Sequence, residues 1–375
     1  METTQNNKID LLSLDLGELT ELLASLGEPR YRAAQIFEQM HRGVSPTEMT
    51  NIGKALKEKL DSVAYFYLPT IERKLVSQID GTVKYLFALR DGHCIESVVM
   101  KYKHGNTICI SSQVGCLMGC AFCASTIGGK VRDLRPSELL GQIMTAQRDM
   151  GERISNIVMM GIGEPLDNYD NVIRFLRLVG HEKGLNIGYR HISLSTCGLV
   201  DKIDKLADED LAITLSISLH AADDETRSSI MPVNKKWNVS SLLDACKRYY
   251  DRTGRRISFE YTLIAGKNDS RAQAERLASL LNSKLRTRSS TMPIHVNLIP
   301  VNEVSEKDFK RSDNNSIKEF AKTLERLGIR ATVRRKLGAD INASCGQLRR
   351  AHEQEKSSTY RMFACPYIKI ERTRH

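Results

Sequence analysis

The chain of 375 residues, 41% of them hydrophobic, is long enough for one large domain and a smaller one. Its 55 Lys and Arg against 45 Asp and Glu give a net charge of +10, which suits a polyanionic partner such as nucleic acid but also simple solubility. No apolar run is long enough to span a membrane and the first residues lack a signal-peptide core, so we expect a cytoplasmic protein with no membrane partner.

The first part of the chain is predicted to be helical. Apolar residues recur at helical spacing in three stretches, at 19–26, 31–40 and 55–60. We therefore expect a helical accessory domain over residues 1–69. Residues 70–101 have strand patterns separated by two Asp-Gly turn signals, which predicts a strand-rich connector.

From about residue 105 strand-like and helix-like stretches alternate. The predicted strands are 107–113, 156–161, 191–196, 212–219, 257–263, 295–299 and, more weakly, 331–335, and the clearest helix is 316–327. Such alternation is typical of an α/β fold with a parallel sheet and right-handed crossovers. We expect a partial (β/α)6-type barrel over residues 102–348, with its chemistry at the carboxyl ends of the strands, and a charged tail over 349–375.

Three cysteines, Cys116, Cys120 and Cys123, follow the first predicted barrel strand with the spacing C-x3-C-x2-C. Nine cysteines in a cytosolic chain do not indicate a disulfide framework. A structural zinc site needs four ligands, usually as two pairs, and no fourth ligand lies nearby. Three crowded thiolates instead predict a [4Fe–4S] cubane with one iron left open to bind a small molecule.

With this cysteine motif the chain resembles the radical S-adenosylmethionine (SAM) superfamily, and further segments resemble its RlmN/Cfr family of RNA methyltransferases. These segments are residues 109–116, 160–165, 194–198, 218–220, 231–234, 296–299 and 344–348. The resemblance runs from about residue 20 to 348. It implies a radical SAM barrel, a [4Fe–4S] cluster, and two SAM molecules consumed in each turnover.

The resemblance also implies which residues contact SAM. They are Gly163, Glu164, Ser195, Ser218, Leu219, His220 and Asn297. Gly161 and Gly163 lie in a Gly-Ile-Gly-Glu run that lacks the third glycine of a dinucleotide-binding motif. We expect these glycines to let the backbone approach a ligand.

Two further cysteines, Cys109 and Cys345, match the catalytic pair of the family. In the scheme that the resemblance implies, Cys345 is methylated, loses a hydrogen atom to the radical and bonds through the methyl carbon to adenine. Cys109 then releases the product and is left in a transient disulfide with Cys345, which must be reduced. Glu96 matches the position assigned as proton acceptor, although a glutamate on a strand leading into the barrel is more often a surface or paired charge.

The implied substrate is adenine carbon 2 in 23S rRNA, and in tRNA beside the anticodon. Two alternatives stay open: Cfr-like methylation of adenine carbon 8, and an RNA-binding protein with a purely structural cluster. We expect a monomer served by an electron donor such as flavodoxin. Basic residues near the predicted barrel mouth are expected to contact phosphates, namely Lys101, Lys103, Lys130, Arg132, Arg135, Arg334, Arg335 and Lys336.

Overall fold

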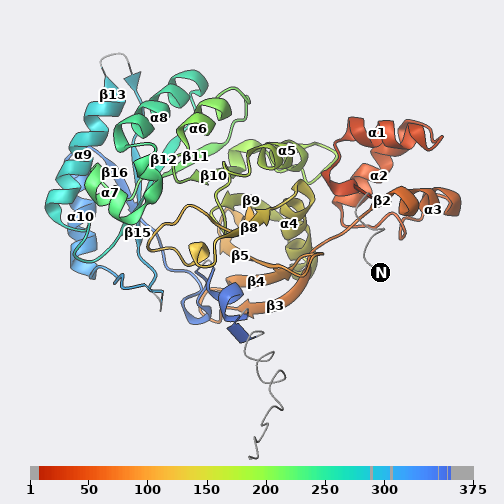
Figure 1. Cartoon of the computed structure of the whole chain (residues 1–375), viewed down its shortest axis with the longest axis horizontal. Helices are drawn as coiled ribbons and strands as arrows, with labels where there is room; N and C mark the ends of the chain where they lie inside the picture. The colour runs from red at the N-terminus through yellow and green to blue at the C-terminus, as the bar shows by residue number, and fades with distance from the viewer. Residues whose placement is uncertain (1–7, 288–289, 305–306, 345, 353, 356–375) are drawn as a thin grey trace, which may run out of the picture.

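The computed structural model describes residues 8–287, 290–304, 307–344, 346–352 and 354–355 (Figure 1). Its centre is a ten-stranded sheet. From one edge to the other the strands are β16 (Arg330–Val333), β15 (His295–Pro300), β12 (Ile257–Leu263), β11 (Thr214–Ser218), β10 (Ile192–Thr196), β9 (Ile154–Met159), β6 (Gly105–Cys109), β5 (Cys94–Tyr102), β4 (Val83–Ala88) and β3 (Thr70–Val76).

The seven strands β6, β9, β10, β11, β12, β15 and β16 pair parallel with one another in this order. The helices that connect them are α4 (Pro136–Met150), α5 (Tyr169–Gly180), α6 (Val200–Leu206), α7 (Asp224–Ile230), α8 (Val239–Thr253), α9 (Arg271–Leu285) and α10 (Asn314–Arg326). They follow the outside of the curved sheet in Figure 1. Every residue of β12 is buried, as expected for a parallel strand covered on both faces. The predicted partial barrel is confirmed.

The predicted strands of the 70–101 segment form β3, β4 and β5, which pair antiparallel with one another, and β5 pairs antiparallel with β6. They extend the barrel sheet at its β6 edge rather than forming a separate one. The first predicted barrel strand divides: β6 ends at Cys109, and Gln113–Gly115 forms β7, a short hairpin with β8 (Lys130–Asp133). A second hairpin, β13 (Arg286–Thr287) with β14 (Ser290–Thr291), was not predicted.

The three predicted N-terminal helices are α1 (Leu16–Ser25), α2 (Tyr31–His41) and α3 (Lys54–Val63). Asp15 and Glu18 form a capping box at the start of α1, each satisfying a backbone N–H of the other. A parallel pair, β1 (Ile9–Asp10) with β2 (Ala64–Tyr65), joins the two ends of this lobe. The remaining elements are short 3-10 turns: η1 (Leu11–Ser13), η2 (Ala124–Thr126), η3 (Tyr189–His191), η4 (Pro232–Lys235) and η5 (Ala339–Ile341).

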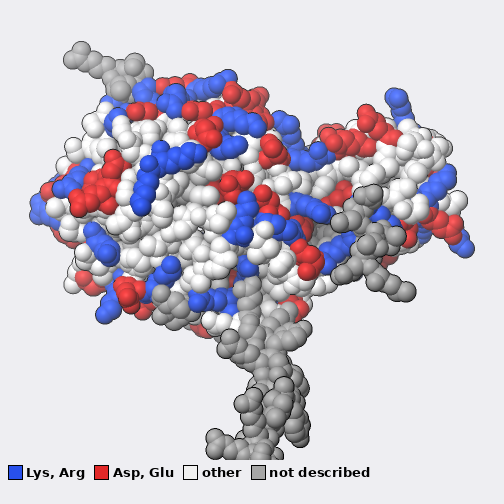
Figure 2. Space-filling view, viewed as in Figure 1, with Lys and Arg blue, Asp and Glu red and all other residues white. Residues whose placement is uncertain are grey.

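Charged side chains are mixed on the surface. Figure 2 shows Lys and Arg interspersed with Asp and Glu on the face seen in Figure 1, with no continuous basic surface there. No helix in the described ranges is both long enough and apolar enough to cross a bilayer.

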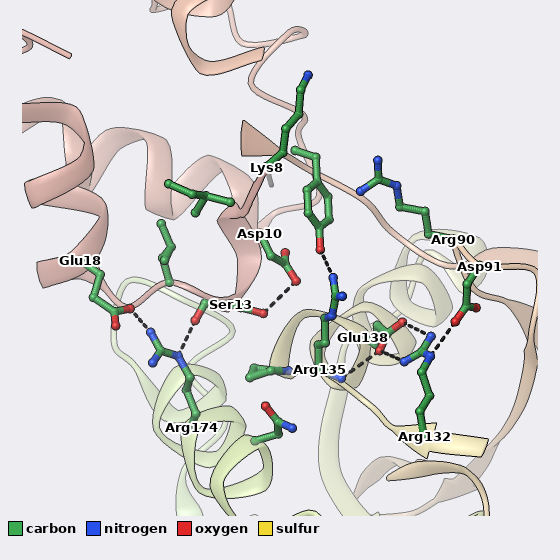
Figure 3. A pocket seen from close by; sticks show the side chains of 15 residues that line it. Lys8, Asp10, Ser13, Glu18, Arg90, Asp91, Arg132, Arg135, Glu138 and Arg174 are labelled. Atoms are coloured by element: carbon green, nitrogen blue, oxygen red, sulfur yellow. Dashed lines mark hydrogen bonds and ion pairs between the residues drawn. The ribbon is translucent and has the colours of Figure 1, made fainter. Parts of the chain in front are cut away.

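Polar contacts hold the N-terminal lobe against the barrel, beside a cavity of about 840 Å³ (Figure 3). Asp10 Oδ2 accepts hydrogen bonds from Ser137 Oγ at 2.5 Å and from Ser13 Oγ at 3.0 Å. Arg174 of α5 pairs with Glu18 and donates to the Ser13 carbonyl. Burial raises the pKa of Asp10. These contacts hold the lobe against the start of α4 and against α5.

Candidate active site

The three cysteines of the C-x3-C-x2-C motif lie in the loop between β7 and η2. The loop is tightly folded: a Cβ on Gly115, whose φ is +81°, would lie 1.9 Å from the Gly129 carbonyl oxygen. The N–H of Cys116 donates to that same carbonyl at 3.1 Å. All three thiols line one cavity of about 220 Å³ at the carboxyl ends of the barrel strands.

The donor set of this loop fits an iron–sulfur cluster, because Cys116, Cys120 and Cys123 line one cavity and thiolates are the ligands that hold such clusters. Burial, followed by the charges of Cys123, Glu164 and Asp167, raises the pKa of Cys116 to about 12. Iron would reverse that shift, because a bound cation favours the thiolate.

The residues predicted to contact SAM divide into two groups. Gly163, Glu164, Ser195, Ser218 and His220 line the cavity of the three cysteines. Leu219 is fully buried, and its carbonyl accepts a hydrogen bond from Arg227. Asn297 lines a different cavity, of about 490 Å³, and donates to Glu260 Oε2 at 2.6 Å.

Glu164 ties two strand ends together from a buried position. Its Oε2 accepts from the N–H of Cys197 at 2.7 Å, and its Oε1 accepts from the N–H of Leu166 at 3.0 Å. Burial raises the pKa of this carboxyl against the lowering effect of these hydrogen bonds. Cys197, an additional thiol, lines the same cavity.

The Gly161–Gly163 backbone makes its close approach to the chain that follows β6. A Cβ on Gly161 would lie 2.5 Å from the Ile110 carbonyl oxygen. At Gly163, where φ is +106°, a Cβ would lie 2.7 Å from Gln113 Cβ and from Ser112 Oγ. We expected these glycines to let the backbone approach a ligand. In the structure they let it approach the neighbouring segment 110–113.

His220 is held in one tautomer. Its Nδ1 accepts from the N–H of Thr262 at 2.9 Å, which leaves the proton on Nε2. Burial, and then the nearby Arg227 charge, lowers the pKa of His220 to about 3. The ring meets Phe122 edge-on, and its φ of +59° is unusual for a residue other than glycine. The site thus contains a neutral imidazole at a strained position.

Two buried charged residues at the site were missed by the sequence reasoning. Arg227 has no exposed surface and donates to the carbonyls of Cys197, Ser218 and Leu219. These bonds hold the ends of β10 and β11 in place. Glu260 lines the cavity from β12, and burial raises its pKa. A carboxylate inside the otherwise strand-like run Ile-Ser-Phe-Glu-Tyr-Thr-Leu was the signal that could have revealed it.

Cys109 lies in a second cavity, of about 270 Å³, that adjoins the first. Met160, Ile299 and Arg334 line both cavities. Cys109 is buried at the end of β6. Residues 342–344, directly before Cys345, form part of the same wall. Cys345 itself lies outside the described residues.

Glu96 is buried on β5 away from both cavities. Its Oε2 accepts from the N–H of Gly346 at 2.8 Å, and its Oε1 accepts from the N–H of Arg349 at 2.6 Å. Lys84 pairs with it at 3.1 Å. Glu96 therefore contacts the segment that follows Cys345.

The predicted basic residues have different environments. Arg334, Arg335 and Lys336 line the second cavity. Ion pairs engage three others: Lys101 with Glu152, Lys130 with Asp133 and Asp167, and Arg132 with Asp91 and Glu138. Arg135 donates to Tyr65 Oη at the edge of the N-terminal lobe. Lys103 is exposed. Within the predicted set the 334–336 run lines a cavity, and contact of these residues with phosphates stays a prediction.

Comparisons with known proteins agree with this geometry. Residues 110–278 match the Radical SAM superfamily, and residues 9–66 match the ribosomal RNA large subunit methyltransferase N-terminal domain. The fold, the cysteine loop and these matches define a radical SAM enzyme, which uses a [4Fe–4S] cluster and SAM.

Relatives make the assignment narrower. The chain is 55% identical over 348 residues to a probable dual-specificity RNA methyltransferase RlmN from Alkaliphilus oremlandii, covering 92% of this chain and 99% of that protein. A namesake from Clostridium tetani is 53% identical over 352 residues, covering 94% and 99%. The crystal structure of a radical SAM methyltransferase from Sphaerobacter thermophilus superposes with a TM-score of 0.84 at 43% identity, covering 90% and 98%. The chain belongs to the RlmN family of RNA methyltransferases.

Proposed function

We propose that the chain methylates carbon 2 of an adenine in 23S rRNA, and of an adenine beside the anticodon in tRNA. The observation that carries this proposal is the pair of adjoining cavities. One contains the three cluster cysteines, and the other contains Cys109 beside the residues that lead to Cys345. A radical formed in the first cavity would therefore lie next to the cavity that contains the methyl group.

The cofactor side of the reaction is assigned to the first cavity. Cys116, Cys120 and Cys123 would hold the cluster. The cluster would supply the electron that cleaves one SAM to a 5′-deoxyadenosyl radical, and another SAM would supply the methyl group. Gly163 and Glu164 receive the ammonium end of SAM, since a nearby cation favours the charged form of a buried carboxyl.

The other proposed contacts complete the same wall. Ser195 and Ser218 offer hydroxyls, and His220 offers its Nε2–H as a donor. Leu219 and Asn297 are proposed to act indirectly, because Leu219 is hydrogen-bonded to Arg227 and Asn297 to Glu260.

The transfer itself is assigned to the two cysteines. Cys345 carries the methyl group as S-methylcysteine, loses one of its hydrogen atoms, and bonds to adenine through that carbon. The adduct would return one electron to the cluster and lose the ring proton. The Cys109 thiolate would then attack the Cys345 sulfur, the released CH2 carbon would take up a proton to become the methyl group, and a Cys109–Cys345 disulfide would remain for the cell to reduce. Burial of Cys109 in the second cavity supports this role, because it keeps the thiol away from solvent oxidants.

Glu96 is the proposed acceptor of the adenine ring proton. Both of its oxygens accept backbone N–H bonds from residues 346 and 349, so this role requires that segment to move first. We propose that RNA binding beside this segment causes that movement.

Recognition of RNA is assigned to the exposed 334–336 run and the N-terminal lobe. The target base leaves its stack to enter the second cavity while phosphates rest on Arg334, Arg335 and Lys336. The proposed division is 1–69 for RNA docking, 70–101 as connector, 102–348 for catalysis and 349–375 as tail. We further propose a monomer reduced by a flavodoxin-like donor.

The test uses Cys109→Ala expressed with substrate RNA. We expect a covalent protein–RNA adduct that is absent from Cys109→Ala/Cys345→Ala, and nucleoside mass spectrometry of the wild-type product should locate the methyl group at carbon 2. Methylation at carbon 8 would overturn the proposed position, and the absence of any adduct would overturn the tether.

A further inference from the structure

Lys84, in the middle of β4, is a charged residue with no exposed surface. In the pairing of β4 with β5, Lys84 lies opposite Val98 and Leu86 lies opposite Glu96. Residues two apart on a strand share a face, so Lys84 and Glu96 stand diagonally on the same face of the sheet. Their Nζ and Oε2 atoms are 3.1 Å apart.

The Lys84 ammonium group has three oxygen partners. Besides its ion pair with Glu96, Nζ donates to the carbonyl of Ser344 at 2.6 Å and to the carbonyl of Asn342 at 3.0 Å. None of the acceptors on the distant segment is a side chain.

The Glu96 carboxylate completes the arrangement on the other side of residue 345. Its two oxygens accept the N–H groups of Gly346 and Arg349. Lys84 thus holds carbonyls before position 345, and its ion-pair partner holds amides after it. Four hydrogen bonds to the main chain fix the segment on both sides of the cysteine.

Neighbouring contacts show that this segment is seated on the sheet as a unit. Asp340 accepts from Ser77 Oγ at 2.7 Å, and Asp80 accepts from the N–H of Gly338 at 2.9 Å. On the opposite side, a Cβ on Gly346 would lie 2.9 Å from Ser125 Oγ, in the turn after the cluster cysteines. The segment therefore lies between the buried ion pair and the cysteine loop.

A buried ion pair is a costly way to hold two strands together, because hydrophobic residues of similar volume usually do so as well. Here the charges do something that apolar residues cannot do, since they bind main-chain groups of a segment some 250 residues away. We propose that Lys84 is a positioning residue: with Glu96 it fixes the backbone on both sides of position 345, and so sets where the Cys345 thiol can reach. This inference rests on the proposed role of Cys345, and Lys84 itself touches neither substrate nor cofactor.

The test compares Lys84→Met with Lys74→Met in the full-length, cluster-loaded enzyme. Lys74 is the matched control: it lies on the other face of the same sheet and pairs with Asp149 at 2.5 Å. Hydrogen–deuterium exchange of the peptide covering residues 338–350 should become roughly tenfold faster in Lys84→Met, because charge-assisted bonds are removed. Exchange in Lys74→Met should match the wild type.

Two chemical readouts accompany the exchange. The fraction of Cys345 carrying a methyl group, measured by peptide mass spectrometry, should fall in Lys84→Met. The ratio of 5′-deoxyadenosine formed to RNA methylated should rise, because the radical is still made but its target is displaced. A purely structural role would lower both products together and leave their ratio unchanged.

Removal of Lys84 alone leaves a buried carboxylate unpaired, so Lys84→Met can fail to fold. Lys84→Met/Glu96→Gln removes both charges and is the second variant. It should fold and still show fast exchange, and exchange is its only readout because Glu96 is also the proposed acceptor of the ring proton. Wild-type exchange at 338–350 in a folded variant would overturn the inference. The exchange result does not depend on which RNA carbon is methylated, so failure of the proposed function is recognised separately from failure of this one.

Discussion

The Oε2 atom of Glu164 accepts a hydrogen bond at 2.7 Å from the backbone N–H of Cys197, and this bond joins the loop after β9 to the loop after β10. Both loops line the cavity of the cluster cysteines. The shape of that cavity therefore depends on a carboxylate that is itself buried, and the same carboxylate is the proposed partner of the SAM ammonium group.

Glu164→Gln should weaken SAM binding while the chain still folds. An amide offers one acceptor oxygen where the carboxylate offers two, so either Cys197 or Leu166 loses its partner, at a cost of about 1–3 kcal/mol. The loss of charge also removes the attraction for the ammonium group. Equilibrium dialysis with the cluster-loaded enzyme measures the dissociation constant for SAM.

The control for that substitution is Asp170→Asn, which removes an exposed carboxylate paired with Lys205 at 3.4 Å on the nearby helix α5. It should bind SAM as the wild type does. Unchanged SAM affinity in Glu164→Gln would show that Glu164 makes no contact with the cofactor.

Arg227→Met should be among the most damaging single substitutions outside the cysteines. It leaves the carbonyls of Cys197, Ser218 and Leu219 without their donor, and loss of a buried charged partner typically costs about 3–5 kcal/mol. Anaerobic urea unfolding measures the change. Arg248→Met, which breaks an exposed pair with Asp204, should cost at most about 1 kcal/mol. Equal effects of the two would refute the argument.

These two residues, Glu164 and Arg227, also show how far the sequence could lead. Glu164 was predicted from the Gly-Ile-Gly-Glu motif. Cys116, Cys120 and Cys123 were predicted because the short spacing between them is enough to indicate a cluster site. Arg227 could not be found, since it stands in the polar run Asp-Glu-Thr-Arg-Ser-Ser, which has the composition of an exposed helix. Only the fold shows that its acceptors are carbonyls at the ends of two other strands.

Lys84 illustrates the same limit on a strand. A lysine in a strand reads as a solvent-facing position, and its acceptors lie at 342 and 344. Lys130 and Arg132 were predicted to contact phosphates, and the sequence did not show that acidic residues distant in sequence, such as Asp167, pair with them. Charge runs locate cations, but only tertiary structure shows which of them are already paired.

The stability of the protein should fall as the pH drops from 7 to 5, in part through His220. Its folded pKa, about 3, lies below the ordinary histidine value of 6.5, so the unfolded chain binds the proton more readily between these values. Stability from this group is therefore present above pH 6.5 and is lost as the pH falls toward 3. By linkage the loss between pH 7 and 5 is about 2 kcal/mol.

Comparison with His220→Asn isolates this contribution. Asparagine tolerates the left-handed backbone of position 220 and does not titrate. Its free energy of unfolding, measured in urea at pH 7 and at pH 5, should change by about 2 kcal/mol less than that of the wild type. An identical pH dependence in both proteins would mean that His220 is not the group responsible.

Gly163→Ala should disrupt the cofactor cavity more than backbone strain alone explains. The new Cβ would meet Gln113 and Ser112 at 2.7 Å, in addition to the unfavourable φ of +106°. Gly254→Ala is the matched control, because Gly254 has a φ of +62° but no atom within 4 Å of the position of a Cβ. The control should cost about 1–2 kcal/mol from its left-handed conformation.

The difference between the two variants reports the collision at Gly163 together with the greater strain of its φ of +106°. We expect Gly163→Ala to lose more stability than Gly254→Ala in thermal unfolding and to bind SAM weakly, while Gly254→Ala binds SAM normally. If both variants bind SAM equally well, the close approach of residue 163 to the chain after β6 is not what shapes the site.

Substitution of Arg335 and Lys336 by alanine should weaken RNA binding in a salt-dependent manner. Both side chains are exposed on the rim of the Cys109 cavity, and no ion pair engages them within the described ranges. Removing one cation that neutralises a phosphate should lower the slope of log affinity against log salt by about 1. Lys101→Ala is the control, since its amine is already paired with Glu152 at 2.6 Å. Fluorescence anisotropy with an RNA hairpin at several salt concentrations measures the slopes, and an equal drop in slope for the control would mean that the 334–336 run has no special part in holding RNA.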